Sequence, residues 1–575
     1  MTRMRAAVTK ARRTVAGCAA VLLGAAALVL AAQPATAANG SVSNVSFSGT
    51  TQAAGATAAW TVGFRTSASG ALGSGGQVVV SFPSGTVPAT GGVTLGTGFT
   101  GCAPTATGTA GTVTVTLAGS SCAVGKNANV QLTVAGVTNP PAQSYSFSVS
   151  TSSDSAGTAT VVIYGPAAKL VFSTQPAGAT GGSAFTSQPV VTALDANNNT
   201  VQNYTGAITL GITAGTGTSG ATLSCTGNPQ PAAAGVAGFT GCRIDKAGTG
   251  YTLTATAGTL TTTSGSFAVT VGTAAMVGFT VQPPATGTAG SALAAFKVAV
   301  QDAGGNTVTG STDGITLSIA SGPTGAVFNS ASTTYTAVPA SAGVASFGGI
   351  VLNTAGSYTF TARDASRTLT TATSTPATTV GAAAGSKLAF AQGPSEETAG
   401  SPIIPAVTVR IIDAYGNPAA TGGVTVALSS SAGSLDAGGT ASTDGTGLAS
   451  FAGAQVNTAA AGLTLTASAP GYGSVTSGSF DVVVRVSNGA ALTDVAADAG
   501  SGVRSVDYYY CAGFTGSCTS ANWTAIGSST SSAGGYPVSW TGQPANGAYR
   551  LVSVAIDNVS NIGTVSASIP VRVAN

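Results

Sequence analysis

The sequence predicts an all-β fold built from tandem β-sandwich domains. Only 6% of the 575 residues are charged and 81 are glycine, so residues that favour long exposed helices are scarce, while those of strands and turns are abundant. Short apolar runs alternate with polar residues at a period of two, as half-buried strands do. One five-residue turn also recurs at the spacing of a small domain.

The recurring turn occupies residues 195–199, 302–306 and 413–417, each time after an apolar run. An aspartate opens every copy and an asparagine closes it. Asp, Asn and Gly bond their own backbone or accept left-handed dihedrals, so each copy predicts a tight turn between strands. The copies lie 107 and 111 residues apart, which fits one domain rather than one solenoid unit.

The first 38 residues predict a secretory signal peptide. Basic residues are followed by an apolar stretch at 15–32 and a small-residue cleavage site at 35–37. Cys18 comes at the start of this stretch rather than after it, which argues against a lipoprotein attachment box. Five of the 19 basic residues lie here, so the mature chain carries 14 basic and 16 acidic residues. That balance predicts no binding of nucleic acid or of an anionic membrane, and no second apolar stretch could span a membrane.

We expect five domains after the signal peptide at 1–38. The ranges are 39–166 for a first β-sandwich, 167–272, 273–383 and 384–485 for three repeats, and 486–575 for a C-terminal domain. The junctions are short and contain no long Gly/Ser spacer, so neighbouring domains should be restricted in their relative motion. In the first domain, Trp60, Val62 and Phe64 alternate with smaller residues, as do several later runs.

The three repeats align beyond the turn. Each opens with a strand-like run, at 169–172, 276–279 and 387–390. After the turn come a core strand, a Gly-x-Ala-x-Phe run and a final alternating strand, always in this order. The three Gly-x-Ala-x-Phe runs lie at 235–239, 343–347 and 447–451. Four matched elements in one order leave little room for chance.

On these motifs, residues 167–485 resemble the tandem bacterial immunoglobulin-like domains of secreted and surface proteins, including the invasin and intimin type. The resemblance implies a sandwich of about seven strands per repeat. It concerns the fold, because that family spans adhesins, enzyme appendages and stalks. Residues 486–575 resemble a different bacterial immunoglobulin-like module, on the Tyr-Tyr-Tyr-Cys run at 508–511 and the Tyr-Pro-Val-Ser-Trp run at 536–540.

The cysteines predict disulfides in an exported chain. Apart from Cys18 there are six, and they fall two by two into separate domains, so local pairing is favoured. The expected pairs are Cys102 with Cys122, Cys225 with Cys242, and Cys511 with Cys518. A metal site is not expected, because the thiols are neither closely spaced nor joined by histidine.

The residue inventory argues against an enzyme and against a cofactor. The sequence contains no histidine, which removes the usual nucleophile–base pairs and imidazole metal sites. Glu396 and Glu397 are adjacent, so on a strand they would face opposite sides and could not flank one glycosidic bond. We therefore expect no catalytic, cofactor-binding or metal-binding residues.

Calcium is the main alternative for the turns. Asp195, Asp302, Asp413 and Asp557 each have an asparagine four residues later, and both side chains carry oxygen ligands. Calcium needs six to eight oxygens, usually with several carboxylates, and each loop offers one. We favour a turn that caps its own backbone.

Carbohydrate binding needs exposed aromatic rings. Trp60 and Trp540 alternate in phase with apolar residues and are expected in cores. Trp523 and the tyrosines at 508–510 remain as candidates, and at least one of these tyrosines must point outward.

These inferences favour an extracellular, non-enzymatic protein with a structural, adhesive or spacer role, which is secreted or associated with the cell surface. Its partners would be cell-wall or other extracellular polymers, or a host or neighbouring surface. The alternative is a glycan- or polymer-binding accessory protein, which should display a cluster of aromatic side chains on one face.

Overall fold

The structure is a computed structural model that describes residues 40–83, 85, 87, 92–432 and 435–575. Within these residues the chain forms strands, turns and irregular segments, and no helix. The prediction of an all-β fold is confirmed. In the described ranges no helix is long and apolar enough to cross a membrane. The expected signal peptide at 1–38, with Cys18, lies outside the described residues.

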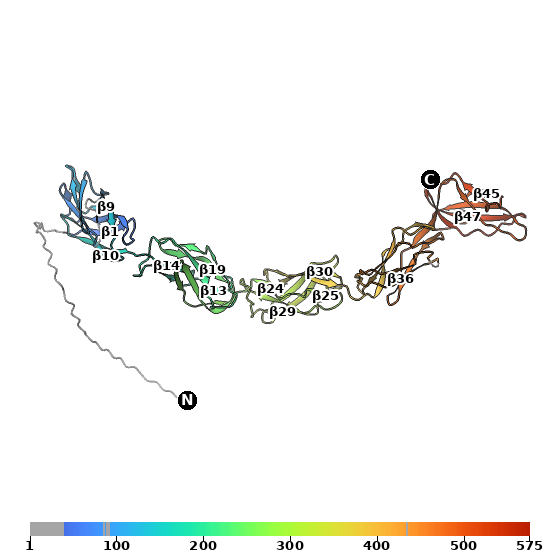
Figure 1. Ribbon diagram of the computed structural model, residues 1–575, viewed down its shortest axis with the longest axis horizontal. Helices are drawn as coiled ribbons and strands as arrows, with labels where there is room; N and C mark the ends of the chain where they lie inside the picture. The colour runs from blue at the N-terminus through green and yellow to red at the C-terminus, as the bar shows by residue number, and fades with distance from the viewer. Residues whose placement is uncertain (1–39, 84, 86, 88–91, 433–434) are drawn as a thin grey trace, which may run out of the picture.

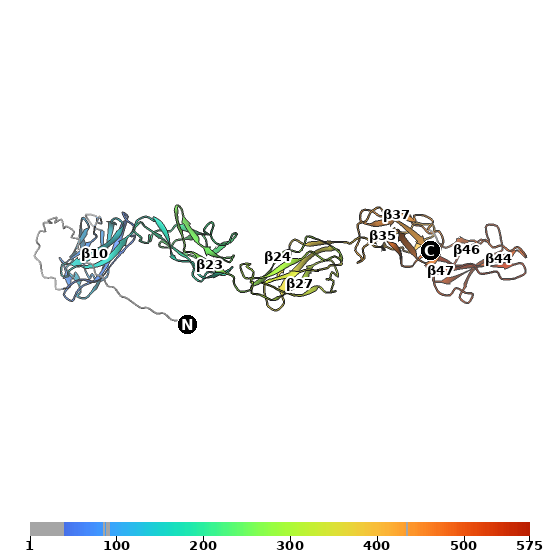
Figure 2. The same cartoon turned by 90° about the horizontal axis from the view of Figure 1, so that it is seen from below.

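The strands gather into five units that follow one another along the long axis of the molecule, as Figures 1 and 2 both show. Each unit has its own apolar core in the described part of the chain. In chain order, the buried residues of these cores span 42–163, 170–269, 277–380, 388–482 and 486–573. Each core falls within one expected domain range, although the boundaries themselves stay a prediction.

The first unit is a sandwich of two sheets. The strands are β1 (Ser43–Gly49), β2 (Thr57–Arg65), β3 (Leu72–Gly73), β4 (Gln77–Ser81), β5 (Gly92–Leu95), β6 (Ala103–Thr109), β7 (Thr112–Ala118), β8 (Ala123–Val124), β9 (Asn129–Thr138), β10 (Gln143–Thr151) and β11 (Gly157–Ile163). Sheet β1-β2-β9-β5 packs on sheet β11-β10-β4-β7-β6, and β3 pairs with β8 in a separate two-stranded sheet. Trp60 is fully buried between them, and its indole N–H donates to Asn139 Oδ1 (3.0 Å). The expected core position of this tryptophan is correct.

Repeats 1 and 2 are each built from short strands. Repeat 1 contains β12 (Lys169–Thr174), β13 (Ala179–Thr180), β14 (Val190–Leu194), β15 (Ala207–Ile212), β16 (Leu223–Thr226), β17 (Gln230–Pro231), β18 (Val236–Gly238), β19 (Thr240–Ile244), β20 (Gly248–Tyr251), β21 (Leu253–Ala257), β22 (Leu260–Thr263) and β23 (Phe267–Thr270). Repeat 2 contains β24 (Met276–Val281), β25 (Thr286–Thr288), β26 (Phe296–Gln301), β27 (Gly314–Ser321), β28 (Thr334–Pro339), β29 (Val344–Phe347), β30 (Gly356–Asp364), β31 (Ala372–Thr373) and β32 (Thr378–Gly381).

Repeat 3 and the C-terminal unit complete the chain. Repeat 3 contains β33 (Lys387–Gln392), β34 (Glu397–Thr398), β35 (Val407–Ile412), β36 (Thr425–Ser430), β37 (Thr440–Ser442), β38 (Leu448–Phe451), β39 (Ala460–Leu463), β40 (Leu465–Ala469), β41 (Gly473–Thr476) and β42 (Phe480–Val486). The C-terminal unit contains β43 (Ala490–Leu492), β44 (Val503–Ala512), β45 (Thr524–Ser529), β46 (Val538–Trp540), β47 (Gly547–Asp557) and β48 (Ile569–Val573).

The repeats match in strand register as well as in sequence. Each has a three-stranded sheet that joins the opening strand, the strand before the turn and the Gly-x-Ala-x-Phe strand: β12-β14-β18, β24-β26-β29 and β33-β35-β38. The opening strand also carries a register shift at the same place in every copy, after Phe172, Phe279 and Phe390. The alignment made from sequence therefore corresponds to equivalent elements in space.

The last two units are joined by a sheet that runs through both of them. Strand β42 leaves repeat 3 and pairs in parallel with β48 of the C-terminal unit, giving the order β34-β42-β48-β47-β44-β45. The expected boundary between 485 and 486 thus falls inside a strand. Backbone hydrogen bonds across this boundary make this junction different from the other three.

All six expected cysteines lie in pairs at disulfide distance. The pairs are Cys102 with Cys122, Cys225 with Cys242, and Cys511 with Cys518. They lie in the first unit, repeat 1 and the C-terminal unit, so each bond would close a loop within one unit. Disulfide pairs of this kind suit an oxidising, extracellular environment.

Candidate functional site

The recurring turn is closed by the carboxylate of its own aspartate. In repeat 2, Asp302 Oδ1 accepts hydrogen bonds from the N–H groups of Gly304 and Asn306, both at 2.9 Å. The Asp302 N–H in turn donates to the Asn306 carbonyl (2.9 Å). Asp195 and Asp413 repeat this pattern. The turn expected from the sequence is therefore present after β14, β26 and β35.

The second carboxylate oxygen of each aspartate holds the linker that enters the unit. It accepts a hydrogen bond from a backbone N–H that lies 30 residues earlier in every case. The pairs are Gly165 with Asp195 (2.9 Å), Gly272 with Asp302 (2.8 Å) and Ala383 with Asp413 (2.9 Å). The aspartates are at most 1% exposed. A buried carboxylate requires hydrogen-bond donors, and the linker supplies one of them.

The asparagine that closes the turn reaches into the preceding unit. Asn306 Nδ2 donates to the Asp245 carbonyl of repeat 1 (2.7 Å), and its Oδ1 accepts from the Ala247 N–H (2.9 Å). At the next junction the same two bonds join Asn417 to the Asn353 carbonyl (2.7 Å) and to the Ala355 N–H (2.7 Å). One five-residue turn thus binds both the linker and the unit before it. We call this arrangement the junction clamp.

The first junction uses a neighbouring asparagine. Asn197 Nδ2 donates to the Ala142 carbonyl of the first unit (2.7 Å), while Asn199 Nδ2 donates to Asp195 Oδ2 within its own turn (3.1 Å). The bond from the linker to Asp195 is the same as at the other junctions. The aspartate–linker bond is therefore common to all three clamps, and the asparagine contact varies.

Glycine allows the units to approach closely at the clamps. A Cβ on Gly304 would collide with the Asp245 carbonyl oxygen and with the backbone of Gly181, both in repeat 1. A Cβ on Gly290 of repeat 2 would collide with the Tyr415 ring from the turn of repeat 3. Since only glycine lacks this atom, these positions bring the surfaces of two units into direct contact.

Hydrogen bonding favours the ionised form of two clamp aspartates, Asp195 and Asp413. Burial raises the pKa of the Asp195 carboxyl, but donors at Gly165, Asn199 and Asn197 outweigh it and hold the pKa below its usual value of 3.8. At Asp413, burial likewise raises the pKa, but hydrogen bonds from Asn417, Ala383 and Tyr415 lower it by more than burial raises it. The linker N–H therefore helps to lower the pKa of both of these carboxyls.

The same hydrogen bonds bear on the calcium alternative. Both oxygens of each clamp aspartate already accept hydrogen bonds from N–H groups of the turn and the linker. At the C-terminal turn, Asp557 accepts from the N–H groups of Val559 and Asn561 and from the Ser501 hydroxyl. Across the described ranges, no group of three or more Asp, Glu, Cys or His could hold a metal ion. We retain the prediction that these turns are structural.

The two glutamates have separate structural roles. Glu396 forms an ion pair with Arg572 of the C-terminal unit and lies 3.9 Å from Arg485 on β42. Glu397 accepts hydrogen bonds from the N–H groups of Thr398 (2.8 Å) and Ile404 (3.2 Å). Glu396 therefore joins repeat 3 to the C-terminal unit beside their shared sheet, a role that sequence reasoning missed because it depends on tertiary contact.

The tyrosines at 508–510 divide between the core and the surface. Tyr508 is buried, and Tyr510 packs against Trp540 with ring centroids 5.4 Å apart. Tyr509 lies on the other face of β44 and stacks on Trp523, with centroids 4.8 Å apart and an interplanar angle of 26°. Both rings of this pair are partly exposed. The outward tyrosine expected from the sequence is therefore Tyr509, and it meets Trp523.

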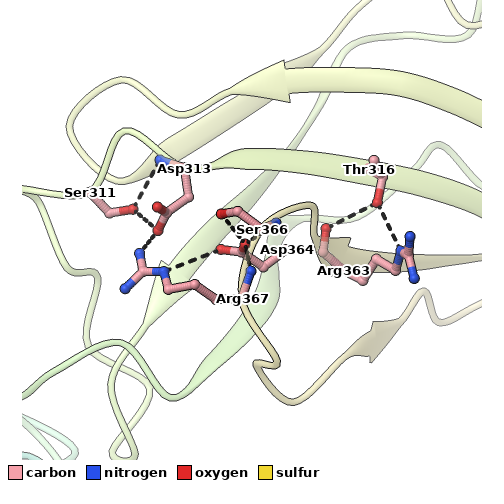
Figure 3. Close-up of polar contacts among 7 residues, drawn as sticks. All are labelled: Ser311, Asp313, Thr316, Arg363, Asp364, Ser366 and Arg367. Atoms are coloured by element: carbon pink, nitrogen blue, oxygen red, sulfur yellow. Dashed lines mark hydrogen bonds and ion pairs between the residues drawn. The ribbon is translucent and has the colours of Figure 1, made fainter.

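A polar cluster in repeat 2 is drawn in Figure 3. Arg367 forms an ion pair with Asp313, and its Nε lies 3.8 Å from Asp364 Oδ2. Asp364 Oδ1 accepts from the N–H groups of Ser366 (2.8 Å) and Arg367 (2.7 Å). The shared arginine therefore joins two loops of repeat 2.

The C-terminal unit contains a cavity of about 260 Å³ that was not predicted from the sequence. Its walls are mainly apolar, and its polar groups include Asp494, Tyr508 and Ser553. Burial, and then the charge of Asp494, raises the pKa of the Tyr508 hydroxyl to about 12. Asp494 is already bonded to the Ser553 hydroxyl. One oxygen of the Asp494 carboxylate, Oδ2, is therefore already occupied within the wall of the cavity.

Comparison with known proteins yields no family. No family model matches the chain, and no curated protein matches it. Three similar solved structures are domains 4–9 of the surface layer protein SbsC, the Escherichia coli adhesin FdeC, and invasin, a bacterial integrin-binding protein. Their identities are 14%, 18% and 14%, and their TM-scores 0.20, 0.21 and 0.18.

These matches are broad but distant. The aligned regions cover 92%, 55% and 76% of this chain, and 81%, 99% and 79% of the other chains, in the same order. At such scores the likenesses carry no argument about function. The assignment of the fold class rests on the strands and sheets described above.

The asparagine of a clamp can be tested by hydrogen exchange. Asn417→Ala removes the acceptor of the Ala355 N–H, and one such bond is worth about 1 kcal/mol. We expect exchange at Ala355 to become faster by a factor of about 5–10. Exchange at Ala247, which Asn306 protects at the previous junction, is the internal control and should not change. Unaltered exchange at Ala355 would show that the asparagine does not hold the junction.

The clamp aspartates also predict a pH dependence of stability. Because the pKa values of Asp195 and Asp413 are lowered in the folded protein, their stabilising contribution is complete above the usual carboxyl pKa and is lost as pH falls through the folded value. We expect the melting temperature to be level between about pH 5 and 7 and to fall below about pH 4. Asp413→Asn should lower stability at pH 6 and reduce the acid-dependent loss. A melting temperature unchanged down to about pH 2.5 would contradict this prediction.

Proposed function

We propose that this chain is an extracellular, non-enzymatic structural, adhesive or spacer protein, secreted or held at a cell surface. The observation that supports this proposal is the junction clamp, which recurs with a 30-residue separation at three successive junctions. A clamp that binds both linker and preceding unit limits the relative motion of neighbours. Restricted junctions between units in a row give reach, which a spacer or surface fibre needs.

The C-terminal end of the row supports the same role by other means. The sheet shared through β42 and β48, together with the Glu396–Arg572 ion pair, joins repeat 3 to the last unit. Every junction in the described part of the chain thus carries specific hydrogen bonds or ion pairs. Few groups that could perform catalysis are present, since the sequence has no histidine and two glutamates.

Small-angle scattering of the mature chain in dilute solution tests this proposal. A compact globule of this length would have a radius of gyration of about 24 Å. A row of five sandwiches, each about eight residues of strand long, reaches at least roughly 130 Å, so we expect a radius of gyration of about 40 Å or more. Replacing Asn197, Asn306 and Asn417 together by Ala should broaden the distance distribution. A value near that of the globule would contradict the spacer role.

A second candidate function is the binding of a glycan or similar polymer. The observation that favours it is the stacking of Tyr509, on β44, against Trp523, which directly precedes β45. Sugar rings pack on such aromatic surfaces. We expect co-sedimentation with an insoluble cell-wall polysaccharide to fall at least about fivefold in Trp523→Ala. Trp540→Phe, a change in the core, is the control. Equal sedimentation of Trp523→Ala and the unaltered protein would eliminate this candidate.

A further inference from the structure

The chain contains a fourth copy of the clamp turn, at residues 557–561 in the C-terminal unit. Asp557 Oδ1 accepts from the N–H groups of Val559 (2.9 Å) and Asn561 (2.7 Å), and the Asp557 N–H donates to the Asn561 carbonyl (3.1 Å). Asn561 Nδ2 donates to Asp557 Oδ2 (2.8 Å), as Asn417 does to Asp413 (2.8 Å). Ser560 has a φ of 73°, matching Asn198 at 68° in the first copy.

The fourth turn differs from the others in what surrounds it. The linker N–H of the clamps is replaced by the Ser501 hydroxyl, which donates to Asp557 Oδ2 (2.9 Å). Asn417 is 6% exposed in its clamp, whereas Asn561 is exposed, and Val559 is 68% exposed. Within the described ranges no hydrogen bond is made to Asn561 Oδ1, the atom that accepts from the preceding unit at Asn306 and Asn417. This turn has the form of a clamp turn without a bound unit.

The surface that receives a clamp turn in repeat 2 has an equivalent in repeat 3. In repeat 2 it consists of Thr-Ala-Gly-Ser at 288–291 and Asn-Thr-Ala at 353–355. Repeat 3 contains the same two sequences at 398–401 and 457–459. The N–H of Gly290 donates to the Leu352 carbonyl (2.9 Å), and that of Gly400 donates to the Val456 carbonyl (3.1 Å). We call each such surface a socket.

The socket of repeat 3 is open. In repeat 2, Asn353 and Ala355 bind Asn417, and a Cβ on Gly290 would collide with Tyr415. In repeat 3, a Cβ on Gly400 would meet only Asn457 Oδ1, at 3.7 Å. Asn457 and Thr458 are exposed. Among the described residues, no hydrogen bond is made to the Asn457 carbonyl or from the Ala459 N–H.

The shared sheet explains why the open socket and the exposed turn are not joined within one chain. The C-terminal unit is held against repeat 3 by β42, β48 and the Glu396–Arg572 ion pair. In this arrangement the turn of the C-terminal unit makes no hydrogen bond with the socket. Both surfaces remain available to another molecule.

We propose that the exposed turn at 557–561 binds the open socket of repeat 3 in a second copy of this chain. Asn561 would donate to the Asn457 carbonyl and accept from the Ala459 N–H, as Asn417 does with Asn353 and Ala355. In the described part of the chain, one turn and one socket of this kind are left unbound, so a two-fold dimer would form the turn–socket contact twice. Two simultaneous contacts also bind more tightly than one. This association goes beyond the spacer role and does not depend on it.

Sedimentation equilibrium of the mature chain tests the proposal. A contact of this size is small, so we expect a monomer–dimer equilibrium with a Kd on the order of 10–100 μM. Asn561→Ala removes the donor and acceptor of the turn, and Thr458→Trp fills the socket. Either change affects both halves of the dimer and should weaken it about 100-fold. Asn306→Ala, the same change in a turn bound within the chain, is the matched control and should leave the Kd unchanged.

The outcomes separate clearly. Association that is lost in both variants and kept in the control supports the proposal. A monomer throughout the range up to about 500 μM would overturn it, as would a dimer that survives either Asn561→Ala or Thr458→Trp. Scattering in dilute solution measures length and sedimentation measures mass, so failure of this proposal and failure of the spacer role can be distinguished.

Discussion

The organisation of the chain depends on a buried carboxylate at each of three junctions. A buried charge is costly unless hydrogen-bond donors surround it. Asp195, Asp302 and Asp413 obtain some of their donors from the turn and one from the linker 30 residues earlier. If the linker left, the aspartate would lose a donor while still buried. The free energy that folds the turn therefore also holds the linker in place.

The junction between repeat 3 and the C-terminal unit meets the same requirement differently. Its stabilising interactions are backbone hydrogen bonds between β42 and β48, reinforced by Glu396 with Arg572 and Arg485. A continuous sheet resists bending more than a pair of side-chain contacts does, because several backbone bonds must break together. The row is thus built from three clamped junctions and one junction formed by a sheet.

Much of the fold could be predicted from sequence because its signals are local. Period-two alternation placed Trp60 and Trp540 in cores, and the Asp…Asn spacing predicted the turns. The clamp was not predicted, since its second half is the N–H of Gly165, Gly272 or Ala383, and a backbone N–H has no sequence signature. The crossing of β42 into the C-terminal unit was missed for a similar reason. Strand pairing between domains depends on tertiary placement rather than on composition.

What each copy of the turn binds therefore depends on which linker, unit or side chain lies next to it. All four copies have the same internal hydrogen bonds, yet three bind a linker and a preceding unit, while the fourth binds the Ser501 hydroxyl of its own unit. The receiving surface behaves likewise, because the Asn-Thr-Ala sequence is half-buried beside Asn417 in repeat 2, whereas Asn457 and Thr458 are exposed in repeat 3. The socket sequences of repeats 2 and 3 are identical, and the fourth turn keeps the opening Asp and the closing Asn although its middle residues at 558–560 differ from those of the clamps. The interaction surfaces of this chain therefore depend on domain order as well as on sequence.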